Sequence, residues 1–117
     1  MPTPRPGTPV RGSTTGRPIM AALDLFGHRW ALRILWELRA GPLSARALLA
    51  RCEGLSSSVL YQRLRELTTN GIIAPSADGY ELTRLGAALG HALRPLNEWA
   101  ITWAQAQEQN DQTPVQA

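Results

Sequence analysis

The chain has 117 residues, a length typical of one domain with a modest hydrophobic core. Hydrophobic residues make up 44% of it, which is usual for a globular protein, and no apolar run approaches the roughly 20 residues of a membrane span. The net charge is +3, and the single cysteine excludes an internal disulfide and a cysteine-rich zinc site. Because the N-terminus lacks the apolar stretch of a secretory signal, we expect a cytoplasmic protein with no membrane partner.

All 12 basic residues are arginine. Codon usage in a GC-rich genome explains this most simply, yet guanidinium forks also match phosphates and guanine edges well. The segment 1–17 is rich in proline, glycine and threonine and contains three arginines but no acid. We expect it to be a disordered arm, followed by a folded domain over 18–107 and a flexible polar tail over 108–117.

Four helices are expected first, over 18–26, 28–39, 45–52 and 57–69. A proline begins the first, and the second carries apolar residues at four-residue spacing. Glycine follows each of the first three helices, where it commonly ends a helix. Serine precedes the third and fourth, as Ser44 and Ser56, and is a favourable N-cap. The only cysteine, Cys52, is expected to be a small buried core residue.

After the fourth helix, the spacing of apolar residues changes from a helical pattern to one typical of short strands. Residues 72–74 and 80–82 are predicted to form short strands, and the Asp78-Gly79 pair marks the hairpin turn between them. Thr83 is then expected to cap a last helix running to about residue 107. Apolar residues recur along this helix at alternating spacings of four and three, which is typical of a helix–helix seam: Leu85, Leu89, Ala92, Leu96, Trp99 and Trp103.

This order of elements, with a short strand after the second helix, is that of a winged helix-turn-helix: mainly α, with a small β-hairpin and a long C-terminal dimerisation helix. In the fourth helix, leucines 60, 64 and 67 line one side. The opposite quadrant carries hydroxyl, amide and arginine side chains. On an arbitrary amphipathic helix, a solvated surface would be the better explanation of such a face. Here the tight turn, the preceding short helix and the following hairpin favour insertion into the major groove of DNA.

The positions of polar residues on the third and fourth helices suggest which of them contact DNA. Gln62 can pair with adenine and Arg65 with guanine or phosphate. Serines in the first turn can hold a phosphate together with the helix dipole. Arg63 lies beside the apolar stripe and is as suited to an ion pair with Glu66 or Glu37 as to the DNA backbone. The full predicted set is Ser57, Ser58, Tyr61, Gln62 and Arg65 on the fourth helix, with Arg46 and Arg51 on the third.

Several short motifs follow one another in a fixed order between residues 17 and 103. They are ALDLFGHRW at 22–30, ILWEL at 34–38, Gly-Pro at 41–42, the stretch from Leu55 to Ile72 and LTRLG at 82–86. Together they resemble the HxlR family of bacterial winged-helix transcription regulators, related in fold to the MarR group. The resemblance implies a homodimer joined by its terminal helices, and an operator of two inverted half-sites on double-stranded DNA.

The sequence departs from that family in two places. Many members carry a cysteine just before the first helix, used in some as a redox switch, whereas Arg17 stands here, so we expect no thiol sensing of that type. Family wings are usually longer and basic, whereas residues 75–80 contain no arginine and include Asp78. The arginines of the N-terminal arm are candidates to replace the wing's contacts with DNA.

The four tryptophans are expected to pack in the core or in an interface. A sharper hypothesis places Trp36 with Trp99 or Trp103 in an apolar pocket for a small aromatic effector near the dimer interface. The two histidines, His28 and His91, have no ligand-spaced partner, so we expect no metal site and no cofactor. Because no nucleotide-binding loop, nucleophile elbow or paired carboxylates appear, we do not expect an enzyme.

Two functions remain open. The leading one is a regulator that binds operator DNA as a homodimer through residues 57–69. The alternative is a winged-helix dimer that binds or sequesters a small molecule or a protein and has little affinity for DNA, because its wing has lost its basic residues.

Overall fold

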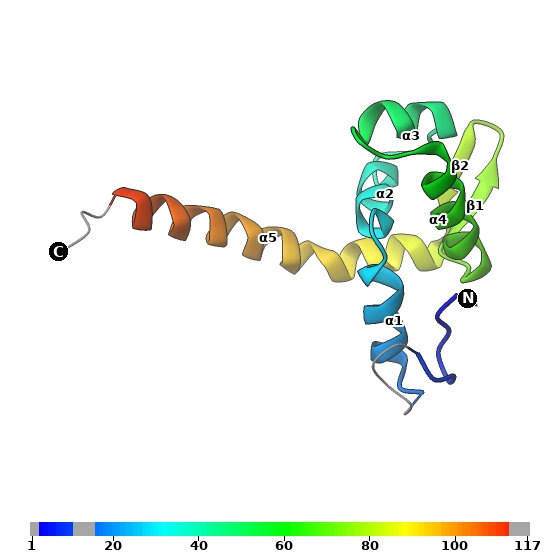
Figure 1. Ribbon diagram of the computed structural model, residues 1–117, viewed down its shortest axis with the longest axis horizontal. Helices are drawn as coiled ribbons and strands as arrows, with labels where there is room; N and C mark the ends of the chain where they lie inside the picture. Colours follow the sequence, from blue (N-terminus) through cyan, green and yellow to red (C-terminus); the bar gives the residue numbers. More distant parts are fainter. Residues whose placement is uncertain (1–2, 11–15, 113–117) are drawn as a thin grey trace.

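The computed structural model describes residues 3–10 and 16–112. Within them the chain forms a small β-hairpin and helices that surround one core (Figure 1). The elements, in chain order, are α1 Pro18–Gly27, α2 Ala31–Leu38, α3 Ala45–Arg51, α4 Ser57–Thr69, β1 Ile73–Ser76, β2 Gly79–Leu82 and α5 Arg84–Gln112. This order confirms the predicted mainly α winged helix-turn-helix with a long C-terminal helix.

The core lies between α2, α3, α4 and the hairpin. The leucine stripe of α4 is fully buried, with Leu60 and Leu67 at 0% and Leu64 at 2% exposure. Cys52, at 0%, is a small core residue as predicted. Apolar side chains from α2 and from the first hairpin strand complete this cluster. The helices therefore pack through the faces that their apolar spacing predicted.

The two predicted serine caps are present. Oγ of Ser44 accepts a hydrogen bond from the amide of Ala47 at 3.1 Å, and Oγ of Ser56 accepts one from the amide of Val59 at 3.3 Å. Each bond satisfies a backbone donor that has no partner in the first turn of a helix. They fix where α3 and α4 begin, and so set the short turn between these two helices.

Two helix ends differ from prediction. Helix α2 begins at Ala31 rather than at residue 28, because Trp30 adopts a left-handed backbone conformation with φ of 77°. A helix cannot pass through such a residue. Helix α5 continues to Gln112 rather than ending near 107. Residues 96–112 contain neither glycine nor proline, so nothing in the local sequence stops the helix earlier.

The hairpin joins the rest of the fold through one further backbone pair. Its strands pair from Ile73 with Leu82 at the base to Ser76 with Gly79 at the tip, so the loop is residues 77–78 and Gly79 begins β2. Leu43 pairs with Tyr80 through two backbone hydrogen bonds of 3.0 and 2.9 Å. A Cβ at Gly79 would collide with the carbonyl oxygen of Leu43. Glycine is therefore required where the wing crosses the segment before α3.

The described part of the N-terminal segment lies against the folded domain. Pro4 is buried, and the side-chain Nδ2 of Asn70, just after α4, donates to Oγ1 of Thr3 at 2.9 Å. Residues 1–2 and 11–15 of the arm expected to be disordered lie outside the described residues. The tail expected over 108–117 is helical to Gln112, and its remainder lies outside them as well.

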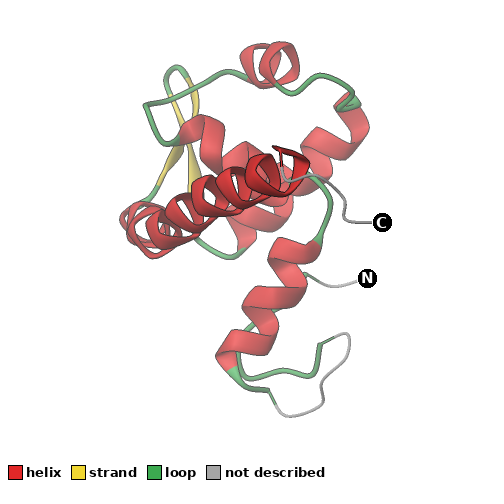
Figure 2. Ribbon diagram, turned by 90° about the vertical axis from the view of Figure 1, so that its left-hand side faces the viewer, coloured by secondary structure: helices red, strands yellow, loops and turns green. Residues whose placement is uncertain are grey.

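Helix α5 consists of two unlike halves. Its first turns pack on the body, where Gly86 lies so close to Ile72 that a Cβ would collide with the Ile72 carbonyl oxygen. Its second half leaves the body and extends outward alone (Figure 1), and Figure 2 views the same helix nearly end-on, in front of the body. Large apolar side chains are more than half exposed there, including Trp99 at 57% and Trp103 at 54%.

Candidate nucleic-acid interface

The face of α4 opposite its leucine stripe is open to solvent. It carries the predicted residues Ser57, Ser58, Tyr61, Gln62 and Arg65, all of which are exposed, and Tyr61 is 45% exposed. Among the described residues, Arg65 has no acidic partner and the side chain of Gln62 makes no hydrogen bond. Their donors and acceptors are thus available to a ligand that presents both phosphates and base edges.

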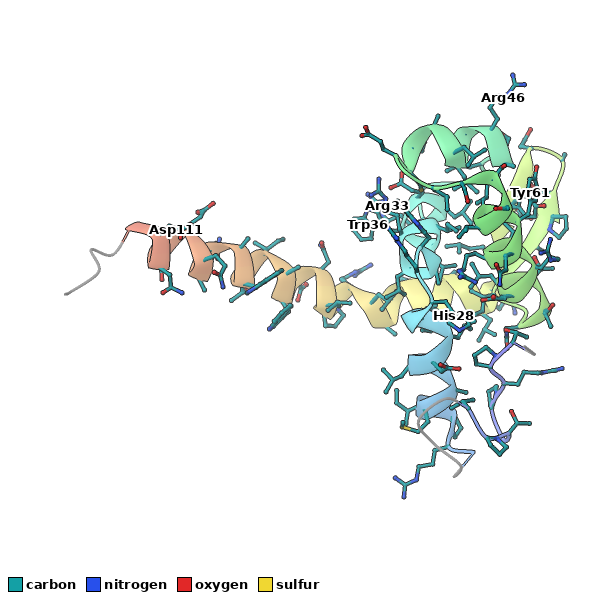
Figure 3. All side chains as sticks on the ribbon, in the orientation of Figure 1. His28, Arg33, Trp36, Arg46, Tyr61 and Asp111 are labelled. Carbon is teal, nitrogen blue, oxygen red and sulfur yellow. The ribbon has the colours of Figure 1, made fainter. Side chains whose placement is uncertain are left out.

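The two predicted arginines of α3 are in different surroundings. Arg46 is exposed and projects from α3 away from the body (Figure 3). Arg51, at the other end of α3, has Nη1 at 3.7 Å from Oε1 of Glu37, and its carbonyl oxygen accepts a 2.8 Å hydrogen bond from Arg33. The structure leaves Arg46 open to solvent and gives Arg51 an acidic neighbour on α2.

A polar network braces α4 against the junction of α1 and α2. Oε1 of Glu66 accepts from Nη1 of Arg63 at 2.7 Å, and Oε2 lies 2.7 Å from Nδ1 of His28. Nε of Arg63 also donates to the carbonyl oxygen of Arg29 at 2.8 Å. All three side chains of the network are largely shielded from water, between 14% and 26% exposed. Of the options open in the sequence, Arg63 takes the ion pair with Glu66.

Sequence reasoning missed the histidine of this brace, because His28 and Glu66 are 38 positions apart. The spacing of three between Arg63 and Glu66 was the only local signal. The brace fixes α4 along its length and in rotation about its axis, since its contacts come from two successive turns toward one corner of the domain. It therefore determines which side chains of α4 face solvent.

The wing adds no positive charge to this surface. Its tip carries Asp78, which is exposed, and its strands contain no arginine. Tyr80 is half-buried, because its backbone pairs with Leu43 and its ring packs against the core. Any contact between the hairpin and a polyanion would thus rely on backbone groups and hydroxyls.

The predicted seam of α5 is largely exposed in the single chain. Leu85 is 59% and Leu96 is 50% exposed, and the rings of Trp99 and Trp103 stack with centroids 5.6 Å apart. Only Leu89 packs on the domain's own core. Leu23 and Ile19 of α1 are exposed as well, at 59% and 61%. Within the described part of the chain, large apolar side chains of α5 and α1 thus remain open to solvent.

The predicted pocket is only partly assembled in one chain. Trp36 is 43% exposed and lines a groove of about 690 Å³ between α2 and α5. Trp99 and Trp103 do not line this groove, so the structure does not bring the three tryptophans together within one chain. The guanidinium of Arg39 lies over the Trp36 ring, 3.7 Å from its centroid, a contact that the sequence did not suggest.

Cys52 is chemically protected. Desolvation by burial raises the pKa of its thiol, with a smaller opposing effect of Arg33. The described residues contain no cluster of three or more histidine, cysteine or acidic side chains able to hold a metal. None of the helices in the described part of the chain combines the length and the apolar character needed to cross a bilayer.

Comparison with known proteins identifies the class of this chain. The model of the HxlR-like helix-turn-helix family matches residues 25–108. The HTH-type transcriptional regulator YvaP of Bacillus subtilis is 32% identical over 89 residues, which cover 70% of this chain and 82% of YvaP. The chain therefore belongs to the HxlR-like helix-turn-helix family. Relatives such as YvaP are HTH-type transcriptional regulators.

Solved structures agree with this assignment. Quinone-bound YodB from Bacillus subtilis matches with a TM-score of 0.68 and 30% identity, over 72% of this chain and 96% of YodB. A MarR-family regulator from Enterococcus faecalis matches with a TM-score of 0.69 and 28% identity, over 86% of this chain and 97% of its own. Both share the winged helix and the long C-terminal helix.

Proposed function

We propose that this protein is an HxlR-type regulator that binds operator DNA as a homodimer, with α4 of each protomer in a major groove. The observation that carries this proposal is the open face of α4. It presents a hydroxyl-rich first turn, Gln62 and Arg65 on a convex helix, with no acid to neutralise them among the described residues. This combination suits phosphate contacts at the helix start and base contacts along its middle.

The proposal of a homodimer rests on α5. A helix whose outer half has no neighbour cannot gain its stability from packing within the chain. Two copies related by a twofold axis would cover the seam from Leu85 to Trp103 with its own equivalent. Such a dimer would present two α4 helices, and so would recognise two inverted half-sites. A role on the chromosome would place the protein in the cytoplasm.

The shortened wing favours one alternative, a winged-helix dimer that binds a small molecule or protein and has little affinity for DNA. Its hairpin offers no cation to a phosphate, and Asp78 would repel one. The quinone-bound state of YodB supports a small-molecule effector for this chain too. We regard DNA binding as the main function, because the face of α4 remains intact beside the reduced wing.

Fluorescence anisotropy with the DNA upstream of the protein's own gene tests the proposal. Replacing Arg65 or Gln62 by alanine should each cost about 1–3 kcal/mol of discrimination between operator and unrelated DNA. Arg46→Ala should weaken binding to operator and to unrelated DNA by the same factor. It should also reduce the slope of log affinity against log salt by about 0.9. Arg84→Ala, which removes the same charge from an exposed position at the start of α5, is the control and should change neither. Equal affinity of the wild type and Arg65→Ala for the operator would support the alternative.

A further inference from the structure

We propose that the groove between α2 and α5 is a binding site for an organic anion, a carboxylate attached to an aromatic or otherwise flat apolar body. This proposal deepens the effector role in the proposed function by naming the site and the ligand class. It differs from the pocket expected from the sequence, since Trp36 takes part and Trp99 and Trp103 do not.

The size and lining of the groove suit a small molecule. Its volume is about 690 Å³, within the range of about 300–1,000 Å³ typical of ligand sites. Leucines from α2, β2 and α5 form its floor and Trp36 stands at its side, with Arg33 beside it on α2 (Figure 3). An apolar floor with one indole favours a flat apolar ligand, which would bury surface that is half-exposed without it.

The charged residues around the groove indicate the sign of the charge that the ligand carries. Three arginines and a histidine line it, and no lining residue is acidic. Arg33 is paired with Glu37 at 2.9 Å. Arg39 and Arg94 have no acidic partner among the described residues: Arg39 donates to the Trp36 carbonyl at 2.7 Å and stacks on its ring, and Arg94 lies 3.5 Å from Nδ1 of His91. Two uncompensated guanidinium groups at an apolar groove favour a carboxylate.

The proposed dimer would leave this groove open. At about 100° per residue, Gly86, Gly90 and Leu93 on the groove side lie roughly a quarter turn from the seam through Leu85 and Trp103. The partner can therefore pack on the seam without filling the groove. Leu89 and Leu96 border both surfaces, so a ligand that shifts α5 relative to α2 would also affect the dimer. The second protomer would therefore occupy the seam of α5, and the small anion would occupy the groove between α2 and α5.

Calorimetric titration of the full chain without DNA tests this site, with 4-phenylbutyrate as the probe and its neutral amide as the isostere. We expect the carboxylate to bind at least about tenfold more tightly than the amide, because charge-assisted hydrogen bonds account for that much affinity. The double variant Arg39→Gln Arg94→Gln should lose at least about tenfold in affinity for the carboxylate and little for the amide. Arg84→Gln, on α5 but outside the groove, is the matched control.

Tryptophan fluorescence gives a second readout, independent of heat. The probe should quench or shift the emission of the wild type, and Trp36→Phe should abolish most of this response. Circular dichroism of each variant checks that it folds. Equal binding of carboxylate and amide, no binding of either, or an equal loss in Arg84→Gln would each overturn the proposal. Because DNA is absent, failure here leaves the effect of Arg65→Ala on operator binding as a separate test of the proposed function.

Discussion

Helices α4 and α5 carry the same kind of apolar pattern with opposite outcomes. In both, apolar residues recur at spacings of four and three. In α4 the stripe is buried within the protomer, with Leu64 at 2% exposure, whereas in α5 the equivalent Leu96 is 50% exposed. The periodicity of a helix indicates that one face needs a neighbour. It does not indicate whether that neighbour belongs to the same chain.

The largest expected effect is on assembly. In the double variant Trp99→Glu Trp103→Glu, two aromatic anchors are lost from each protomer, hence four from a twofold interface. Interface tryptophans of this kind each account for about 2 kcal/mol or more, so the loss is on the order of 8 kcal/mol before non-additivity is considered. Analytical ultracentrifugation should show a monomer for this variant and a dimer for the wild type.

The matched control adds the same two charges elsewhere on α5. Thr102 and Gln105 are exposed and lie away from the seam, so Thr102→Glu Gln105→Glu should remain dimeric. Dissociation of this control as well would show that charge on the helix, rather than loss of the seam, separates the protomers.

A second pair of variants separates the two stripes directly. Leu64→Ala removes a buried side chain and should lower the free energy of unfolding by about 2–5 kcal/mol at every protein concentration. For Leu96→Ala, the loss should depend on protein concentration, because this residue acts through the proposed dimer. Urea unfolding at several concentrations measures both. A concentration-independent loss at Leu96 would mean that α5 folds back on its own chain.

The brace on α4 is expected to have a smaller effect. Glu66→Gln breaks the ion pair with Arg63 and weakens the contact with His28. These three side chains are only 14–26% exposed. We expect a loss of about 1–2 kcal/mol in unfolding free energy, together with weaker operator binding because α4 is less firmly oriented. In Glu37→Gln, whose arginine partners are about half exposed, the loss should be at most about 1 kcal/mol. Equal losses in both variants would argue against a special role for the brace.

The smallest effect concerns Cys52. Burial raises the pKa of its thiol above the ordinary value of 9.0, so the unfolded chain releases this proton at lower pH than the folded protein does. The contribution of this thiol to stability should be constant below pH 9. It should then fall as the pH rises toward the folded-state pKa, by at most about 1.4 kcal/mol per pH unit. Cys52→Ala should lack this slope in urea titrations compared with the wild type at pH 8 to 10.

The sequence by itself determined the order of the elements, the serine caps of α3 and α4, and the exposed face of α4 beside its leucine stripe. These features depend on residues a few positions apart, where helical geometry alone fixes which side chains share a face. It placed the start of α2 three residues early, because only the packed structure holds Trp30 in a left-handed conformation.

Tertiary structure decided the features that join distant parts of the chain. It brought His28 to Glu66, paired Arg51 with Glu37, and separated Trp36 from the tryptophans of α5. It also left the seam of α5 uncovered while it buried the stripe of α4. The physical reason is the same in each case: local periodicity sets which face of a helix is apolar, but the way the helices dock determines what that face meets.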